Sequence, residues 1–180
     1  DAMSNLTSDQ IRSIDSATLA SLSEVKFDSL TSDQLSKLTT TQINALNSDQ
    51  LRAFATDEIE ALTSEQVGAL ATDSLAALFR SHMESMETDY LRALSTTQIN
   101  ALTPDHIEAL TSDQAKALTT AQIAALSSDQ LNYMTTDNLQ KLTSDQIRAI
   151  ETVDMQNLST DGIQALTSEQ VSWLTTGQIG

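Results

Sequence analysis

The chain has 180 residues, of which 39% are hydrophobic but only 3% aromatic, and its 25 acidic and 9 basic residues give a formal net charge of −16. An acidic surface without a basic patch repels phosphate backbones, so we expect no nucleic-acid partner. The absence of cysteine excludes disulfides and thiolate sites. No apolar run approaches the roughly 20 residues of a membrane helix, so we expect no membrane insertion.

An eight-residue period runs through the chain without insertion or deletion. When Leu6 is counted as the first place of a repeat, all 22 first-place residues and all 22 sixth-place residues are apolar. The consensus is Leu-Thr-Ser-Asp-Gln-Ile-x-Ala, and residues 142–149 match it at every fixed place. Such self-similarity is typical of repeat architectures in which each unit is stable only when it stacks on its neighbours.

The register predicts a single domain over residues 1–180. It is one continuous array of 22 repeats, from Leu6 to Gly180, preceded by a partial repeat at residues 1–5. Neither end has the polar capping repeat that usually closes such an array, which indicates a segment of a longer protein.

Each repeat carries several signals for the start of a helix. The second place is Ser, Thr, Asp or Asn in 17 of 22 repeats, and the fifth is Gln or Glu in 13, which is the pattern of a capping box. The fourth place is acidic in 14 repeats, near the positive end of the helix dipole. The one proline, Pro104, stands at the third place, which is the first helical position. Every repeat is therefore predicted to contain one short helix.

Two other folds fit the pattern poorly. Apolar residues recur every four residues on average, whereas one continuous helix turns every 3.6 residues and its apolar stripe would drift around the surface. A β-solenoid turns on glycine and asparagine, and the chain has only 4 glycines. We predict an all-α solenoid of very short capped helices, one per eight-residue repeat.

The repeat itself leaves open whether two, three or four helices form one coil of the solenoid. We favour three, a triangular prism, because three walls bring their Leu and Ile side chains to one narrow axis. His82 and His106, which share the fifth place three repeats apart, give weak support. The eighth place is Ala or Ser in 16 of 21 repeats, which suits close helix approach at a corner. The seventh place varies and is predicted to face solvent, at Arg12, Asn44, Glu60, Lys116 and Gln164 among others.

The octapeptide resembles the Leu-Thr-x-x-Gln-Ile/Val-x-Ala tracts of very large secreted bacterial repeat proteins. Residues 118–125, Leu-Thr-Thr-Ala-Gln-Ile-Ala-Ala, illustrate the match, which covers essentially the whole chain. Proteins with such tracts are described as adhesin-like, as RTX-like (calcium-binding-toxin-like) or as haem utilisation or adhesion proteins. The resemblance implies an extracellular or cell-surface location in a bacterium.

One stretch departs from the consensus and is a candidate recognition patch. Phe79 and Arg80 replace the usual Thr-Ser pair, His82 replaces Gln, and Tyr90 follows at the same place in the next repeat. The patch would also include His106. The alternative is a drifted repeat whose spacing survives. For the two histidines, metal or haem binding competes with a role as solvent-facing substitutes at the helix cap.

The sequence predicts no catalytic, cofactor-binding or metal-binding residue, and we expect no enzyme activity. The fourth-place aspartates could bind Ca²⁺ between coils, but a Ca²⁺ site needs six to eight oxygens, and helix capping explains these carboxylates. The predicted function is a stiff spacer or stalk in an extracellular adhesin, matrix or surface-filament protein, with possible self-association end to end or laterally. The alternative is a module that binds a divalent cation, haem or a protein at the acidic face or around His82.

Overall fold

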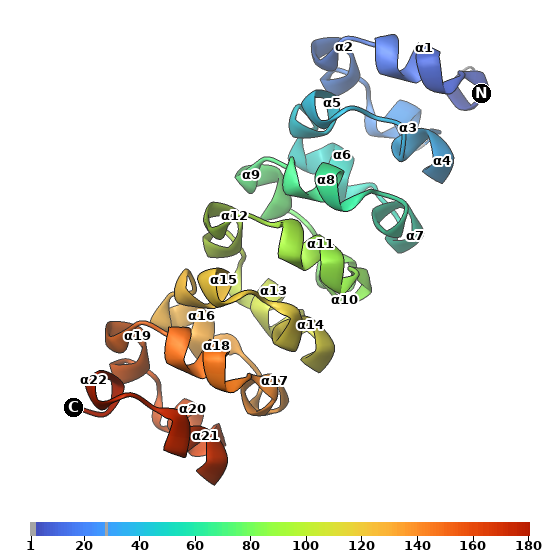
Figure 1. Cartoon of the computed structure of the whole chain (residues 1–180). Coiled ribbons are helices and arrows are strands. Elements are labelled where there is room, and N and C mark those ends of the chain that lie inside the picture. Colours follow the sequence, from blue (N-terminus) through green and yellow to red (C-terminus); the bar gives the residue numbers. More distant parts are fainter. Residues whose placement is uncertain (1–2, 28) are drawn as a thin grey trace. The chain divides into compact units, whose positions relative to one another are not determined.

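The computed structural model describes residues 3–27 and 29–180, and the chain divides into two compact units, Asp1–Leu94 and Ser95–Gly180. Over the described residues every regular element is helical: 22 α-helices of four to six residues and one short 3-10 helix, η1, with no strand (Figure 1). The predicted all-α class, with one short helix per repeat, is confirmed.

The helices follow one another at intervals of one repeat. The first unit contains η1(Met3–Asn5), α1(Ser8–Ser13), α2(Ser16–Ala20), α3(Glu24–Phe27), α4(Ser32–Leu35), α5(Thr40–Asn44), α6(Ser48–Arg52), α7(Thr56–Glu60), α8(Ser64–Gly68), α9(Thr72–Leu75), α10(Arg80–Ser85) and α11(Thr88–Ala93). The second unit contains α12(Thr96–Asn100), α13(Pro104–Ala109), α14(Ser112–Ala117), α15(Thr120–Ala124), α16(Ser128–Tyr133), α17(Thr136–Lys141), α18(Ser144–Ala149), α19(Thr152–Gln156), α20(Thr160–Ala165), α21(Ser168–Trp173) and α22(Thr176–Ile179).

The helix starts are those that the capping box predicts. In α5, the N-cap residue Thr39 has an extended backbone (φ −74°, ψ 157°), and its Oγ1 accepts from the Gln42 backbone N–H at 3.2 Å. Gln42 Oε1 in turn accepts from the Thr39 backbone N–H at 2.8 Å. Pro104 begins α13, as its place in the repeat predicts. The two reciprocal bonds satisfy amide donors that have no partner within the helix.

The corners between helices need no unusual backbone conformation. At the corner after α13, Leu110 (φ −56°, ψ 134°) and Thr111 (φ −75°, ψ 162°) are successive extended residues. The Leu110 N–H closes the helix by donating to the Ile107 carbonyl at 3.4 Å. Among the residues that the structure describes, none has a positive φ. This explains how the chain turns at every repeat with so few glycines.

Within each unit, a helix packs on the helix three further along the chain. The packed pairs of the first unit are α2 with α5, α3 with α6, α4 with α7, α5 with α8, α6 with α9, α7 with α10 and α8 with α11. Those of the second unit are α12 with α15, α13 with α16, α14 with α17, α15 with α18, α16 with α19, α17 with α20, α18 with α21 and α19 with α22. One coil therefore consists of three helices, as predicted.

The core consists of the two apolar places of the repeat. Sixth-place side chains such as Ile43 and Ile99 are fully buried, and first-place side chains such as Leu46 and Leu102 are 2% and 4% exposed. Phe27 and Phe54 contribute a stacked pair, with ring centroids 5.4 Å apart. Burial of this kind contributes most of the favourable free energy of folding, which a single eight-residue repeat cannot supply alone.

Candidate functional site

The fifth-place glutamine makes hydrogen bonds in two directions. In α5, Gln42 Oε1 completes the capping box, while its Nε2 donates to the backbone carbonyls of Ile11 and Ile14 at 2.8 and 2.7 Å. These carbonyls lie at the end of α1 and in the corner that leads to α2, the helix on which α5 packs. We call this contact, from a fifth-place side chain to carbonyls at the corner one coil earlier, the inter-coil bridge.

The bridge recurs in both units with the same spacing. In every example, the glutamine donates to the carbonyls of the residues 28 and 31 positions earlier. Examples are Gln34, Gln42, Gln50 and Gln66 in the first unit and Gln130, Gln146, Gln170 and Gln178 in the second. The array is therefore joined coil to coil by side-chain amides as well as by apolar contacts.

The bridge meets a need that short helices create. The last carbonyls of a helix lack partners within it, and in a stack of short helices many of these carbonyls are buried. The bridging glutamines are themselves 1–6% exposed, so their amides also need partners. Among the described residues, no buried side-chain nitrogen or oxygen atom lacks a hydrogen-bond partner. The fifth place thus serves both its own helix and the coil before it.

The sequence contained a signal for this second role that the capping interpretation left unused. A capping box needs only an acceptor at the fifth place, which Glu supplies as well as Gln. The chain nevertheless has Gln there in 12 repeats and Glu in one, Glu58. A preference for the amide over the carboxylate indicates a required donor.

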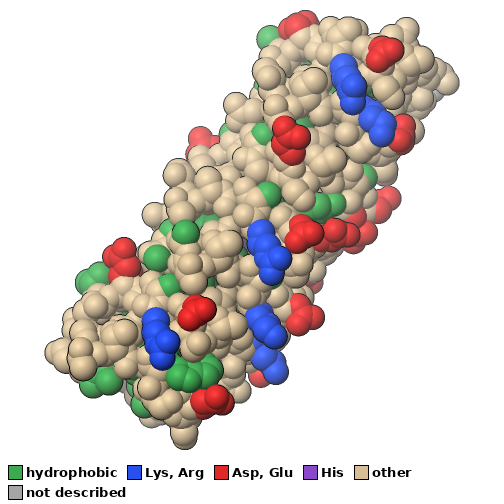
Figure 2. Space-filling view, in the orientation of Figure 1, with side chains coloured by type: hydrophobic (Ala, Val, Ile, Leu, Met, Phe, Trp, Pro, Cys, Tyr) green, Lys and Arg blue, Asp and Glu red, His purple; other side chains and the backbone are tan. Residues whose placement is uncertain are grey.

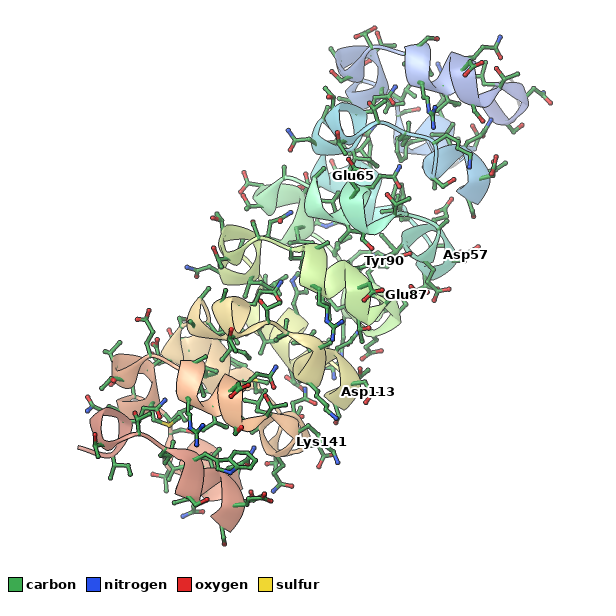
Figure 3. The ribbon with its side chains drawn as sticks, viewed as in Figure 1. Asp57, Glu65, Glu87, Tyr90, Asp113 and Lys141 are labelled. Atoms are coloured by element: carbon green, nitrogen blue, oxygen red, sulfur yellow. The ribbon has the colours of Figure 1, made fainter. Side chains whose placement is uncertain are left out.

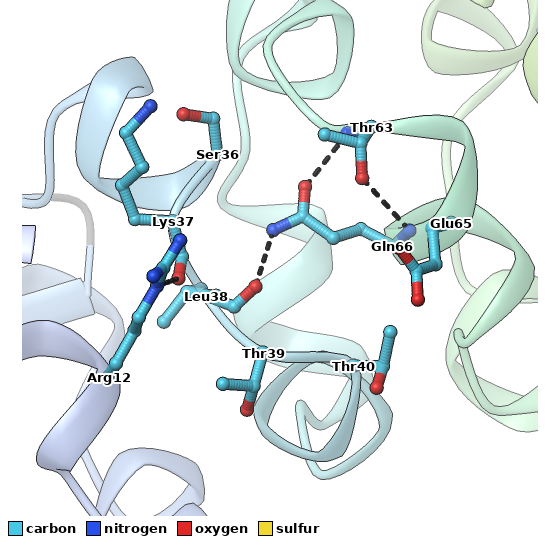
Figure 4. A pocket seen from close by; sticks show the side chains of 9 residues that line it. All are labelled: Arg12, Ser36, Lys37, Leu38, Thr39, Thr40, Thr63, Glu65 and Gln66. Carbon is cyan, nitrogen blue, oxygen red and sulfur yellow. Dashed lines mark hydrogen bonds between the residues drawn. The ribbon is translucent and has the colours of Figure 1, made fainter.

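A surface groove of about 450 Å³ exposes one bridge to view (Figure 4). Gln66 Nε2 donates to the Leu38 carbonyl at 2.8 Å on the groove wall, and Gln66 Oε1 accepts from the Thr63 N–H at 2.8 Å. Arg12 enters from the preceding coil, and its Nε donates to the Lys37 carbonyl at 3.1 Å. The residues that line the groove are Arg12, Ser36, Lys37, Leu38, Thr39, Thr40, Thr63, Glu65 and Gln66. Its walls consist largely of groups that cap helices or join coils.

Three other residue types replace glutamine and keep the bridge. Ser74 Oγ donates to the Leu46 carbonyl at 2.7 Å, and Asn138 Nδ2 donates to the Leu110 carbonyl at 2.7 Å. The hydroxyl of Tyr90, labelled in Figure 3, lies 2.7 Å from the Glu60 carbonyl and 2.6 Å from the Leu62 carbonyl. Because the phenol has one proton, these two acceptors share it.

The two histidines also occupy the fifth place and substitute for glutamine there. His82 is 3% exposed; its Nδ1 accepts from the Phe79 N–H at 3.2 Å, and its Nε2 lies 2.9 Å from the Phe54 carbonyl. His106 is 2% exposed, and its Nδ1 accepts from the Thr103 N–H at 3.3 Å. Both make the capping bond of a glutamine substitute, but both are buried rather than solvent-facing, and His82 faces the preceding coil.

Three fifth-place residues cannot donate to the earlier corner. Glu58 keeps the capping bond, in which its Oε2 accepts from the Ala55 N–H at 2.8 Å, and its carboxylate has no proton to donate. Asp154 in α19 reverses the polarity of the contact: its Oδ1 accepts from the Ser128 N–H of α16 at 2.8 Å. Gly162 has no side chain. The helical fold tolerates these changes because the apolar places around them are unaltered.

The predicted recognition patch separates into exposed and buried members. Phe79 is 52% exposed, and Arg80 is exposed and paired with Glu84, with Arg80 Nε 2.9 Å from Glu84 Oε1. The Phe79 ring lies against His82 with centroids 5.5 Å apart, but His82 and Tyr90 are buried in bridges. The last member, His106, belongs to the second unit. Of the members of the predicted patch in the first unit, only Phe79 and Arg80 are therefore exposed.

The seventh place is exposed as predicted, yet it also reaches across coils. Arg52 Nε donates to the Ala77 carbonyl at 3.1 Å, and Arg148 Nε donates to the Trp173 carbonyl at 3.2 Å. Gln140 makes the same contact with Ala165. Each donor lies 25 residues before its acceptor, in the direction opposite to the fifth-place bridge. Long polar side chains at this place therefore join a coil to the next one.

Surface charges add little to this framework. On the face in view, Figure 2 shows acidic and basic side chains separated by other side chains and backbone. Three exposed ion pairs join residues three or four positions apart in the sequence: Lys37 with Asp33, Arg52 with Asp49, and Arg92 with Asp89. Exposed pairs of this kind contribute little to stability. In α2, hydrogen bonds from the Thr18 hydroxyl and backbone N–H hold the pKa of the N-cap residue Asp15 below its usual value.

The fold changes the titration of Tyr90, one of the fifth-place residues. Burial raises the pKa of its phenol, and the nearby carboxylates of Glu87 and Glu60 raise it further. Figure 3 shows Tyr90 and Glu87 at neighbouring positions of the array. Deprotonation would remove the donor from the bridge and place a negative charge beside the two carbonyls, so the bridge exists only with the neutral phenol.

Two features are absent from the part of the chain that the structure describes. No group of three or more His, Cys, Asp or Glu side chains is arranged so as to hold a metal ion. None of the described helices combines the length and the apolar character needed to cross a membrane.

The sequence was also compared with known proteins. No curated protein matches the chain. The model of the ALTTAQ repeat family matches residues 43–79, 83–120, 115–144 and 147–180, which together make up well over half of the chain. The six letters of the family's description are also the sequence of residues 117–122, at the junction of two repeats. The structure gives these letters a meaning: Leu118 is the apolar first place, Thr119 is the N-cap, and Gln122 completes the capping box. This chain is a member of the ALTTAQ repeat family.

Proposed function

We propose that the chain is a non-catalytic spacer or stalk module in an extracellular bacterial adhesin, matrix or surface-filament protein. The observation that carries the proposal is the use of its polar side chains. The recurring second-place, fifth-place and many seventh-place groups bind backbone atoms of their own helix or of a neighbouring coil. A polar group engaged in this way supports the array and is not available for chemistry on a substrate.

The stacking also supports a role that depends on length. Each coil adds the same three helices and contacts its neighbours through the same places. In solenoids, stability grows by nearest-neighbour interfaces, so repeats can be added without redesign of the core. A spacer needs this property, whereas an enzyme or a compact binding domain does not.

The spacer role requires stiffness, which spin-label distances test. The chain has no cysteine, so pairs of introduced cysteines give unique labels. The exposed seventh-place residues Asn44 and Lys116 are nine repeats apart in the sequence, one in each unit, which corresponds to three coils if the stacking continues unbroken. For the variant pair N44C and K116C we expect a narrow distance distribution at roughly 8–10 Å per coil.

Matched pairs within a single unit provide the control. Asn44 with Arg92, and Lys116 with Gln164, are seventh-place pairs two coils apart inside the first and second unit, respectively. If the pairs within a unit give narrow distributions and the pair across the units gives a broad one, the units are joined flexibly. That result would contradict a stiff spacer.

The second candidate is a ligand-binding module, which the half-exposed Phe79 ring beside Arg80 favours. An aromatic side chain next to a cation is a common anchor in protein interfaces. Thermal unfolding with Ca²⁺, with haem and with EDTA separates the two candidates. A rise of many degrees in the unfolding temperature with Ca²⁺ or with haem would favour the binding module. For haem, this rise should be lost in the consensus variant F79T/R80S. Ca²⁺ binding and self-association stay predictions.

A further inference from the structure

The two histidines of the chain occupy positions that only one protonation state satisfies. The backbone N–H of Phe79 points to Nδ1 of His82, so this nitrogen must hold a lone pair. The Phe54 carbonyl lies 2.9 Å from Nε2, so that nitrogen must hold the proton. The contacts therefore require the neutral imidazole protonated at Nε2. In this form it imitates the amide of glutamine, with an acceptor towards the cap and a donor towards the preceding coil.

His106 meets the same requirement at the cap. Its Nδ1 accepts from the Thr103 N–H at 3.3 Å, and its own backbone N–H donates to Thr103 Oγ1 at 3.3 Å. The side chain is 2% exposed, so water cannot replace a lost partner. A second proton on either imidazole would set one N–H against another at the helix start and would bury a positive charge.

The chain has only these two histidines, and both stand at the bridge place. Imidazole is the side chain that ordinarily changes charge between about pH 5 and pH 8, whereas the glutamine amide does not titrate. We propose that His82 makes the contact of α10 with α7 sensitive to mild acid, so that protonation of its imidazole loosens the array at this helix. His106 repeats the capping half of this arrangement at the start of α13. This goes beyond the spacer role, which glutamine at both positions would serve equally.

Nearby carboxylates would favour a protonated imidazole, which opposes the effect of burial, but these carboxylates lie at the solvent-exposed surface. On the helices that pack against the two imidazoles, and on their own helices, acidic groups outnumber the single cation. They are exposed or half-exposed, so water and salt screen their attraction for an imidazolium. These groups are Asp57, Glu58 and Glu60 on α7, Arg80 and Glu84 on α10, Asp105 and Glu108 on α13, and Asp129 on α16. The lost hydrogen bond and the buried charge are not screened in this way, so they decide the sign.

The test compares the full chain with the double variant H82Q/H106Q, which restores the consensus residue at both places. Unfolding equilibrium constants are measured by urea denaturation at about pH 7.5 and about pH 5.5, on either side of ordinary imidazole titration. We expect acidification to raise the unfolding constant of the natural chain more than that of the variant, with an additional factor of about ten from His82. The carboxylates titrate in both proteins and cancel in the comparison.

Nitrogen NMR of the natural chain provides a second measurement that does not depend on the variant. At the higher pH, both imidazoles should show protonated Nε2 and unprotonated Nδ1. The single variants H82Q and H106Q assign the loss of stability to α10 or α13. An equal response of the natural chain and the double variant to acid, or imidazoles that become doubly protonated while the folded chain keeps its stability, would overturn the proposal.

Discussion

Within the first unit, two successive coil contacts use the same core but different bridges. Where α4–α6 pack on the coil before them, the fifth-place residues are Gln34, Gln42 and Gln50, and each donates to two carbonyls. Where α7–α9 pack on α4–α6, the corresponding residues are Glu58, Gln66 and Ser74. Gln66 donates to two carbonyls, Ser74 to one, and the Glu58 carboxylate has no proton to donate.

The apolar residues do not distinguish these two contacts. The sixth-place side chains are fully buried in both, for example Ile43 in α5 and Ile59 in α7. The comparison teaches that the spacing of the apolar places determines the fold, while the fifth place determines how many hydrogen bonds hold one coil to the next. The four predictions below test this division of roles, beginning with the largest expected effect.

The largest effect is expected when one complete bridge is removed from the contact between α4–α6 and the coil before them. Gln42→Ala deletes the capping acceptor and leaves the buried carbonyls of Ile11 and Ile14 without their side-chain donor. We expect the free energy of unfolding, measured by urea denaturation, to fall by about 2–4 kcal/mol. The matched control is Gln10→Ala, because exposed Gln10 makes the same capping box with Thr7 at the start of α1. The control should lose only about 1 kcal/mol; equal losses would mean that the bridge adds nothing.

The approach of α8 to α11, where Tyr90 replaces glutamine, depends on a glycine. A Cβ atom added to Gly68 would lie 2.9 Å from the Ala93 carbonyl oxygen, and this backbone atom moves only with its helix. We expect Gly68→Ala to lower the free energy of unfolding by about 1–3 kcal/mol, despite the better helix propensity of alanine. Gly177→Ala, whose Cβ would meet only the Thr152 hydroxyl at 3.4 Å, is the control and should be neutral or stabilising. If both variants change the free energy of unfolding equally, the contact with the Ala93 backbone does not limit how closely α8 and α11 approach each other.

The Tyr90 bridge should be lost in alkali. Since burial, and then Glu87 and Glu60, raise the pKa of Tyr90, the folded chain holds the phenolic proton more tightly than the unfolded chain does. This contribution to stability is complete below the ordinary tyrosine pKa, about 10, and disappears as the pH rises through the raised value. Tyr90→Phe should cost about 1–2 kcal/mol at neutral pH and should remove this part of the alkaline decline. Tyr133→Phe, at a half-exposed ring, is the control for loss of a phenol.

Local patterns in the sequence predicted the helices, their caps and their core. The capping box at Thr39 and Gln42, the place of Pro104 and the apolar first and sixth places all depend on neighbours within one repeat, which the sequence displays directly. The repeat left two, three or four helices per coil open, and three was favoured because three walls fill a narrow axis. The recognition patch at Phe79, Arg80, His82, Tyr90 and His106 was proposed from unusual composition alone, and composition does not reveal which side chains face the preceding coil.

The inter-coil bridge was missed because capping already explained glutamine at the fifth place. Its acceptors lie 28 and 31 residues away, a separation that has no meaning until the coil is known to contain three helices. The burial of His82 and the reach of Arg52 to Ala77 depend on the same stacking. The sequence did offer a chemical signal: the fifth place holds an amide in 13 of 22 repeats and a carboxylate in only two, although a carboxylate would cap equally well.

The smallest prediction strengthens the weaker of the two contacts. Glu58→Gln keeps the shape of the side chain and its capping bond to Ala55, and it supplies an amide to the carbonyls of Phe27 and Leu30, which stand in the bridge positions. We expect a gain of about 0.5–1.5 kcal/mol in the free energy of unfolding. Glu60→Gln removes the same charge from an exposed seventh-place side chain and should change stability little. If both variants stabilise the chain equally, relief of negative charge is sufficient, and the number of bridging donors is not what makes the two coil contacts differ.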